Sequence, residues 1–248
     1  MYKVSVITGI GPLSKYGKFI ERYTENVQEQ EMFEETEHVI VYSEYGKELD
    51  ILSNLKNFKL VKEQEMLGVY NAWNIGIQHS STKYVTNWNI DDLRHPSNIK
   101  KKHDLLEANP NISVAYNYYI ATSDFNENFY NIKESGKYVL LFPDNYEEYA
   151  QTACLCGPDP VWRKEIHSEI GYFDYVNYPS IGDWEMWLRM AQNGYKFKLI
   201  PEILCIYYDH ADTVSRNSES LLNLQFKNLR EQYKDFKTQH HTLLSHTF

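Results

Sequence analysis

The chain has 248 residues, with 34 acidic and 25 basic side chains, so its formal net charge at pH 7 is −9. This length suits one large or two small domains with a sizeable core, and the ordinary hydrophobic content excludes a disordered chain. The acidic balance and the lack of a long basic run argue against a nucleic-acid partner, because little counterion release would drive such binding.

The first half of the chain alternates short apolar runs with helical patterns. Strands are expected at residues 3–9, 37–43, 57–63, 83–90 and 112–120, and helices at residues 14–30, 68–80 and 96–109. Ser14 is available to cap the first of these helices, and Pro96 opens the last. The alternation predicts an α/β fold with a doubly wound, mostly parallel sheet flanked by helices.

The second half is less regular. Residues 120–145 are expected to form a loop or hairpin, and a helix is expected to start at Gly182–Asp183 and to end on Gly194. Two strands are then expected at residues 195–200 and 203–208. Apolar residues at helical spacing predict one amphipathic C-terminal helix over residues 218–248 that packs against the body, with a dimer or membrane-surface role as the alternative.

Three cysteines without a disulfide or zinc spacing predict a reduced, cytoplasmic chain. No stretch is long and apolar enough to span a bilayer, and the first residues, MYKVSVITGI, lack the pattern of a signal peptide. Any contact with a membrane is therefore expected to be peripheral.

The stretch NWNIDDLRHP, from Asn87 to Pro96, places Asp91 and Asp92 just after the fourth expected strand. In an open α/β sheet, ligands bind outside the carboxyl ends of the strands. Two adjacent carboxylates repel each other unless a positive charge lies beside them. A Mg²⁺ or Mn²⁺ ion that also holds a diphosphate would supply this charge, whereas capping of the next helix is the purely structural alternative.

Four further segments follow the expected third strand in a fixed order: GVYNAWNIGI, GPDPVWRKEI, GDWEMWLRMAQNGYKFKLIPEIL and YYDHADTVSR. Together with the acidic stretch, this succession resembles the inverting nucleotide-sugar glycosyltransferases of family 2, which have the GT-A fold. The resemblance extends from about Tyr2 to about Arg216. It implies one catalytic domain over residues 1–217, with a nucleotide-sugar-binding half at 1–119 and a smaller, mixed acceptor-binding half at 120–217.

The resemblance also implies roles for individual residues on the donor side. Asp91, supported by Asp92, would bind Mn²⁺ or Mg²⁺, with His210 as a further ligand and Asn89 in place of the first acid of the usual D-x-D-like motif. The positions expected to contact the nucleotide or the donor sugar are Thr8, Gly9, Glu44, Gly68, Asn71, Asn74, Asn89, Asp91 and Arg216. Trp73, in the same segment as Asn71, is expected to pack in the core.

Asp183 corresponds to the catalytic base of that family. An acceptor hydroxyl has a high pKa and needs a positioned carboxylate to take its proton, while a metal stabilises the leaving nucleoside diphosphate. An N-cap is the structural alternative for Asp183. Trp162, Arg163 and Trp184 are the expected acceptor contacts, with core packing as the alternative for Trp162.

These implications predict transfer of a sugar, with inversion, from a nucleoside-diphosphate donor to a hydroxyl of a glycan or lipid-linked acceptor, in glycan or polysaccharide synthesis. A UDP-sugar is the donor that the resemblance favours. Three alternatives stay open: a nucleotidyltransferase, a protein that binds a nucleotide sugar without turnover, and a glycoside hydrolase that uses two acids and no metal.

Overall fold

The computed structural model describes residues 1–65, 67–131, 138–141, 143–210, 219–239 and 244–247. The strands in this part of the chain are β1 (Val4–Ile10), β2 (Thr36–Tyr42), β3 (Phe58–Lys62), β4 (Tyr84–Asn87), β5 (Leu93–Arg94), β6 (Val114–Thr122), β7 (Tyr138–Leu141), β8 (Val161–Arg163), β9 (Phe197–Tyr208) and β10 (Leu244–Thr247). The α-helices are α1 (Leu13–Tyr16), α2 (Ile20–Gln28), α3 (Asp50–Ser53), α4 (Val69–His79), α5 (Asn98–Ala108), α6 (Ile166–Ile170), α7 (Gly182–Gln192) and α8 (Glu219–Gln232).

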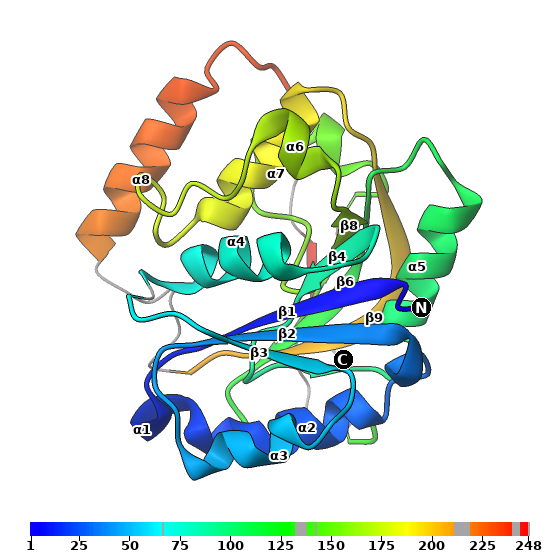
Figure 1. Ribbon diagram of the computed structural model, residues 1–248. Helices are drawn as coiled ribbons and strands as arrows, with labels where there is room; N and C mark the ends of the chain where they lie inside the picture. Colours follow the sequence, from blue (N-terminus) through cyan, green and yellow to red (C-terminus); the bar gives the residue numbers. More distant parts are fainter. Residues whose placement is uncertain (66, 132–137, 142, 211–218, 240–243, 248) are drawn as a thin grey trace.

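One twisted sheet runs through the middle of the molecule, with α1, α2 and α3 on one face and α4, α7 and α8 on the other (Figure 1). Its main path has the order β10-β7-β6-β8-β4-β1-β2-β3, and β9 pairs with β5 and β6. The pairs β1–β2, β2–β3 and β1–β4 are parallel. The α/β fold with a doubly wound sheet is therefore confirmed in the first half of the chain.

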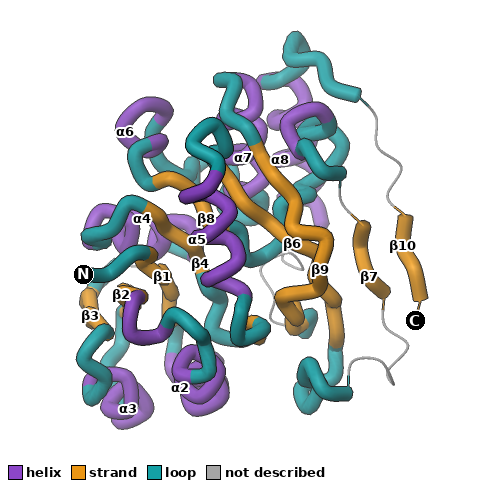
Figure 2. Tube along the Cα trace, turned by 90° about the vertical axis from the view of Figure 1, so that its right-hand side faces the viewer, coloured by secondary structure: helices purple, strands orange, loops and turns teal. Residues whose placement is uncertain are grey.

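The second half extends this sheet with mixed strand directions. β8 is antiparallel to both β4 and β6, whereas β9 is parallel to β6 and antiparallel to β5. β7 and β10 form an antiparallel pair at the edge opposite β3 (Figure 2). The loop or hairpin expected at residues 120–145 thus contributes a strand.

A single 12-residue strand, β9, replaces the two strands expected at residues 195–200 and 203–208. The pairing with β6 moves from Asn117–Ile200 to Tyr118–Ile203, which leaves Pro201 and Glu202 out of the ladder. Proline cannot donate a backbone hydrogen bond, so a bulge at this point lets the strand continue past it.

Two predicted helices differ from the structure. The helix expected at residues 14–30 is divided into α1, a short 3₁₀ segment η1 (Gly17–Phe19) and α2, and Pro12 rather than Ser14 occupies the N-cap position of α1. The C-terminal helix ends at Gln232 instead of reaching residue 248, and β10 follows it. Backbone pairing with β7 stabilises that strand, which the helical spacing of the sequence does not reveal.

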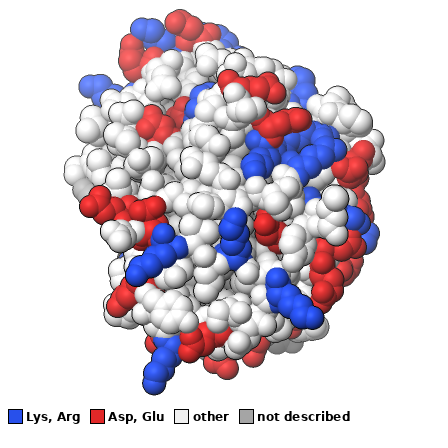
Figure 3. Space-filling model, viewed as in Figure 1, with Lys and Arg blue, Asp and Glu red and all other residues white. Residues whose placement is uncertain are grey.

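The sheet separates two hydrophobic clusters. The cluster on the α4 and α7 side includes Trp73, Phe173 and Trp187, whereas the other contains Phe19 and Trp88. Leu229 of α8 and Tyr233, just after this helix, belong to the first cluster, so the prediction that the C-terminal helix packs against the body is confirmed over α8. Lysines, arginines, aspartates and glutamates are mixed over the face seen in Figure 3. None of the helices that the structure describes is long and apolar enough to cross a membrane.

Candidate active site

A pocket of about 640 Å³ opens where the carboxyl ends of β1 and β4 meet the N-termini of α4 and α7. Gly9 of β1 and Gly68 at the start of α4 belong to its lining. A Cβ at Gly9 would lie 2.7 Å from the Cβ of Ala72, so glycine lets β1 and α4 pack closely. Gly68 has a φ of 97°, a conformation that favours glycine where the chain turns into α4.

Asp91 and Asp183 line this same pocket, although they are 92 residues apart in the sequence. Asp183 lies in the first turn of α7, whereas the N-cap position belongs to Ile181. The purely structural reading of Asp183 as an N-cap therefore does not describe its place in the helix. The structure brings together these two acids, one from the turn after β4 and one from the start of α7.

The carboxylate of Asp183 is held by several donors. The hydroxyl of Tyr70 donates to Oδ1 at 2.8 Å, and the backbone N–H of Trp184 donates to the same oxygen at 2.9 Å. The thiol of Cys154 lies 3.5 Å from Oδ2. Burial raises the pKa of Asp183, while the hydrogen bonds from Tyr70, Trp184 and Cys154 act in the opposite direction. The result is a fixed carboxylate at the pocket wall, with a higher pKa than an exposed aspartate has.

Tyr70 reaches Asp183 because the first turns of α4 and α7 lie against each other. A Cβ on Gly182 would lie 2.9 Å from the ring of Tyr70, so only glycine leaves room for this approach. Tyr70 is not among the residues predicted from the sequence, because no local pattern connects it with Asp183, which lies 113 positions away.

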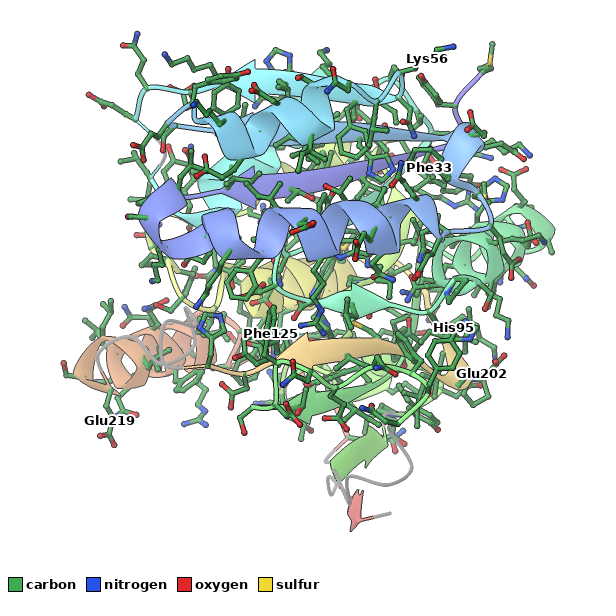
Figure 4. All side chains as sticks on the ribbon, turned by 90° about the horizontal axis from the view of Figure 1, so that it is seen from below. Phe33, Lys56, His95, Phe125, Glu202 and Glu219 are labelled. Atoms are coloured by element: carbon green, nitrogen blue, oxygen red, sulfur yellow. The ribbon has the colours of Figure 1, made fainter. Side chains whose placement is uncertain are left out.

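Asp91 pairs with His210 at the other end of the pocket. Oδ2 of Asp91 and Nε2 of His210 are 2.8 Å apart, and the two side chains are 14% and 12% exposed. The rings of Phe19 and Tyr208 lie 5.7 and 5.0 Å from the imidazole of His210. Phe125 contacts both rings and lies beside the end of β9 in Figure 4. Aromatic packing therefore holds His210 beside Asp91.

Asp92, expected to support Asp91 at a metal, is not brought to the pocket by the structure. Its carboxylate accepts hydrogen bonds from Nδ2 of Asn89 and from the backbone N–H of Tyr208, each at 3.0 Å. It is 3% exposed and is absent from the pocket lining. Burial, and then the negative charge of Asp91, raise its pKa. Asp92 thus joins the loop after β4 to β9, because both of its oxygens face donors inside the protein.

Of the other expected donor contacts, Gly9, Gly68 and Asn89 line the pocket, while Thr8 and Asn74 are buried outside its lining. The hydroxyl of Thr8 is bonded to that of Tyr23 at 2.9 Å. The amide of Asn74 makes two hydrogen bonds, of 2.8 and 3.0 Å, with the backbone of Phe173. The structure therefore does not bring these two side chains to the pocket, because both form hydrogen bonds within the core.

Asn71, Glu44 and Arg216 complete the set of expected donor contacts. Asn71 accepts a hydrogen bond from the backbone N–H of Leu67 at 3.1 Å and does not line the pocket. Glu44 is exposed, lies outside the pocket lining, and accepts from the backbone N–H of Leu13 at 3.4 Å. Arg216 lies outside the described residues.

Of the three expected acceptor contacts, two lie outside the pocket lining and one belongs to it. Trp162 is fully buried in β8 and donates to His167 at 2.9 Å, and Arg163 donates to the carbonyls of Ile112 and Leu106 at 2.9 and 2.8 Å. Neither lines the pocket, so the structure does not bring them to the place of an acceptor, and Trp162 packs in the core as the alternative for it expected. Trp184 does line it, with its ring 5.7 Å from that of Phe226.

Phe226 belongs to α8, so the C-terminal helix also contributes to the pocket wall. From the sequence, this helix was expected to pack against the body, with a dimer or membrane-surface role as the alternative, and no contact with the pocket was predicted for it. Cys154, Tyr119 and Tyr207 are further lining residues that it did not find. Aromatic residues are frequent throughout this chain, with 21 tyrosines, so composition gave no signal for these positions.

Residues 13–171 match the protein family described as Glycosyl transferase family 2. Two curated relatives are the Uncharacterized glycosyltransferase MJ1057 of Methanocaldococcus jannaschii, 23% identical over 61% of the chain, and the Amylovoran biosynthesis glycosyltransferase AmsE of Erwinia amylovora, 22% identical over 66%. The chain spans only 51% and 59% of the lengths of these two relatives.

Solved structures share the architecture. S. aureus TarS 1-349 in complex with UDP-GlcNAc has a TM-score of 0.66 at 15% identity, over 96% of this chain and 76% of that one. The mannosyltransferase PcManGT from Pyrobaculum calidifontis, in complex with GDP-Man and Mn²⁺, has a TM-score of 0.64 at 16% identity, over 97% and 67%. With the family match covering more than half of its length, this chain belongs to glycosyl transferase family 2 and has the GT-A fold.

Proposed function

We propose that the protein is an inverting glycosyltransferase that moves a sugar from a UDP-sugar to a hydroxyl group of a glycan or lipid-linked acceptor, with Asp183 as the base. The observation that carries the proposal is that Asp91 and Asp183 line one pocket of about 640 Å³. Family membership supports the reaction class, and the UDP-GlcNAc in the TarS structure supports the choice of nucleotide.

Asp183 has the properties of a base for an alcohol. It is fixed by Tyr70 and by the backbone N–H of Trp184, and its pKa is raised by burial, so its affinity for a proton exceeds that of an exposed aspartate. A base of this kind removes the proton of an acceptor hydroxyl as that oxygen attacks the anomeric carbon. Attack from the face opposite to the leaving diphosphate inverts the configuration at that carbon.

Asp91 and His210 are the residues that would hold a divalent cation. Their side chains are partly exposed, lie 2.8 Å apart and offer one oxygen and one nitrogen, a donor set that suits Mn²⁺. Within the described residues no cluster of three His, Cys, Asp or Glu side chains forms a complete site, so diphosphate oxygens and water would complete the shell. The Mn²⁺ in the PcManGT structure supports this proposal. When bound, the cation would supply positive charge that stabilises the departing diphosphate.

The acceptor would approach from the side of α7 and α8, where Trp184 and Phe226 line the pocket. Their neighbouring aromatic rings offer an apolar surface for the carbon face of a sugar. AmsE, named for amylovoran biosynthesis, supports a role in glycan or polysaccharide synthesis.

A binding screen followed by a product assay tests the proposal. UDP and GDP, alone and as nucleotide sugars, are added with and without Mn²⁺, and the unfolding temperature is measured, because a ligand that binds the native state raises it. We expect the largest increase with a UDP-sugar and Mn²⁺. Release of UDP that depends on a glycan acceptor, with inverted configuration in the product, supports transfer, whereas binding without any turnover contradicts it.

A further inference from the structure

The loop after β6 (residues 123–131) is held against α2 by Arg22. The guanidinium of Arg22 donates to the backbone carbonyls of Phe125 and Glu127, at 2.6 and 3.0 Å. The same guanidinium lies 4.5 Å from the centre of the Phe125 ring. One side chain of α2 therefore fixes both the backbone and the ring of a loop that lies 103 to 105 positions away in the sequence.

The part of this loop that carries Phe125 also has hydrogen bonds of its own. The backbone N–H of Glu127 donates to the carbonyl of Asp124 at 3.2 Å, and the N–H of Asn126 donates to the carboxylate of Asp124 at 2.9 Å. Phe125 lies between these groups. The loop is therefore an ordered turn, and the hold of Arg22 on its carbonyls also fixes the place of the Phe125 ring.

Phe125 connects this loop with the site proposed for the cation. Its ring lies 5.8 Å from that of Phe19 and 5.6 Å from that of Tyr208. These are the two rings that pack on the imidazole of His210. Figure 4 shows Phe125 beside the end of β9, where Tyr208 is the last residue of the strand. A continuous set of contacts thus leads from Arg22 through Phe125 to His210.

Two different elements supply the proposed ligands of the cation. Asp91 lies in the turn after β4, and His210 follows β9. The N–H of Asp209 donates to the carbonyl of Thr122 at 2.7 Å, which fixes the backbone just before His210. The rings packed on the imidazole then set its direction. Loss of a group that orients a metal ligand typically lowers the affinity for the metal about 10-fold to 100-fold.

Arg22 also carries a positive charge close to the acids of the site. Burial lowers the pKa of its guanidinium, while Tyr208, Asp92 and Asp124 nearby act in the opposite direction. A cation bound to Asp91 would meet repulsion from this charge, so loss of the charge alone should strengthen Mn²⁺ binding. Loss of the hold on the loop should weaken it. The sign of the change in affinity therefore separates the two effects.

From these contacts we propose that Arg22 is a positioning residue for the cation site, because it fixes the loop after β6 so that Phe125 supports His210 beside Asp91. The role belongs to residues outside the pocket lining, since neither Arg22 nor Phe125 is part of it. This inference rests on the proposed function, because the cation is the one that would bind the nucleoside diphosphate.

Binding of Mn²⁺ to the full chain in the presence of UDP, measured by calorimetry, tests the role of Arg22. Arg22→Met keeps most of the length of the side chain but loses its donors, and it should raise the Kd for Mn²⁺ about tenfold. Its affinity for UDP in EDTA should stay within about twofold of the wild type. Arg22→Lys keeps the charge but replaces the planar fork only in part, so its Kd should lie between the other two.

Phe125→Leu tests the next contact, and it is the second variant if Arg22→Met does not fold. It removes the ring that packs on Phe19 and Tyr208, and it should raise the Kd for Mn²⁺ about tenfold as well. Lys18→Met is the matched control. It removes an exposed cation whose Nζ lies 4.9 Å from the centre of the Phe19 ring, and it should leave the Kd within about twofold.

Three results would overturn the proposal. Arg22→Met binds Mn²⁺ as tightly as the wild type or more tightly, or Lys18→Met loses as much affinity, or UDP affinity in EDTA falls by the same factor as a general loss of structure would cause. If wild-type UDP affinity rises with Mn²⁺ in the same experiment, only the role of Arg22 fails. If UDP binding to the wild type does not depend on Mn²⁺, the cation site of the proposed function fails as well.

Discussion

The pocket wall and a buried ionic cluster, in which Asn98 and Lys102 of α5 meet Asp159, both contain polar groups in the interior, but these groups differ in their partners. In the cluster, Nζ of Lys102 lies 2.6 Å from Oδ2 of Asp159 and 3.0 Å from Oδ1 of Asn98, and the lysine and aspartate side chains are at most 1% exposed. One oxygen of Asp159 has no partner, but the charge of the carboxylate is neutralised by Lys102. In the pocket wall, by contrast, the N–H groups of Trp73 and Trp187 have no acceptor in the described protein.

A buried polar group that finds its partner inside the chain contributes to stability, whereas one without a partner lowers it. Asp91 and Asp92 differ in their surroundings, although they are neighbours in the sequence. Asp92 is paired with Asn89 and the backbone of β9, while Asp91 lies at the pocket with His210.

The largest expected effect is on catalysis at Asp183. Asp183→Asn keeps the size of the side chain but removes the base, so kcat for sugar transfer should fall by about 10³-fold to 10⁴-fold. UDP binding, measured by calorimetry, should stay within about twofold, because the pocket keeps its shape. Substantial remaining activity together with weakened UDP binding would contradict the role of Asp183 as the base and indicate a role in nucleotide binding.

A substitution in the ionic cluster should lower the stability of the fold rather than the catalytic rate. Lys102→Met leaves the carboxylate of Asp159 buried without its cation, which should lower the free energy of unfolding by about 3–5 kcal/mol. Lys101→Met is the control, because the pair of Lys101 with Glu202 is 39% and 49% exposed, and surface pairs contribute about 0–1 kcal/mol. Urea unfolding measures the free energy of unfolding of both variants. Equal losses of this free energy would contradict the prediction that the buried pair contributes more than the exposed one.

Substitutions of the neighbouring residues Asp91 and Asp92 test which of the two binds the proposed metal. Asp91→Ala should lower the affinity for Mn²⁺ in the presence of UDP by at least about 100-fold, because it removes a charged ligand. Asp92→Asn should change that affinity by only a few-fold, since its side chain faces Asn89 and β9. The Mn²⁺ dependence of UDP binding measures both variants. A larger loss in Asp92→Asn would restore Asp92 as a ligand.

Tyr70→Phe should have the smallest of these effects, because it removes one hydrogen bond from Asp183 and keeps the ring. A base acts when it is ionised, so activity is lost as the pH falls through the pKa of Asp183. Tyr70 stabilises the ionised form, and its loss should raise that pKa further and move the acidic limb of the kcat–pH profile to higher pH. Activity at acidic pH should fall about tenfold, with less change at high pH. Superimposable profiles for the variant and the wild type would contradict this role.

Much of the framework follows from patterns of neighbouring residues. The alternation of strands and helices predicts the parallel part of the sheet, and the rule that ligands bind at carboxyl ends of strands places Asp91 at a site. The family resemblance added Asp183 and His210, and the structure puts Asp183 in the pocket with Asp91 and pairs His210 with Asp91. These predictions depend on short segments, in which local order and residue type carry the information.

The sequence by itself thus determined the α/β order, the family and the positions of two acids at element ends. Only the tertiary structure decided which side chains line the pocket and which are paired within the core. Thr8, Asn74, Trp162 and Arg163 match an expected motif but are paired within the core, while Tyr70, Trp73, Trp187 and Phe226 reach the pocket from helices far apart in the chain. The reason is that a hydrogen-bond partner or a cavity is a property of segments brought together by folding, and no local pattern records which of them will meet.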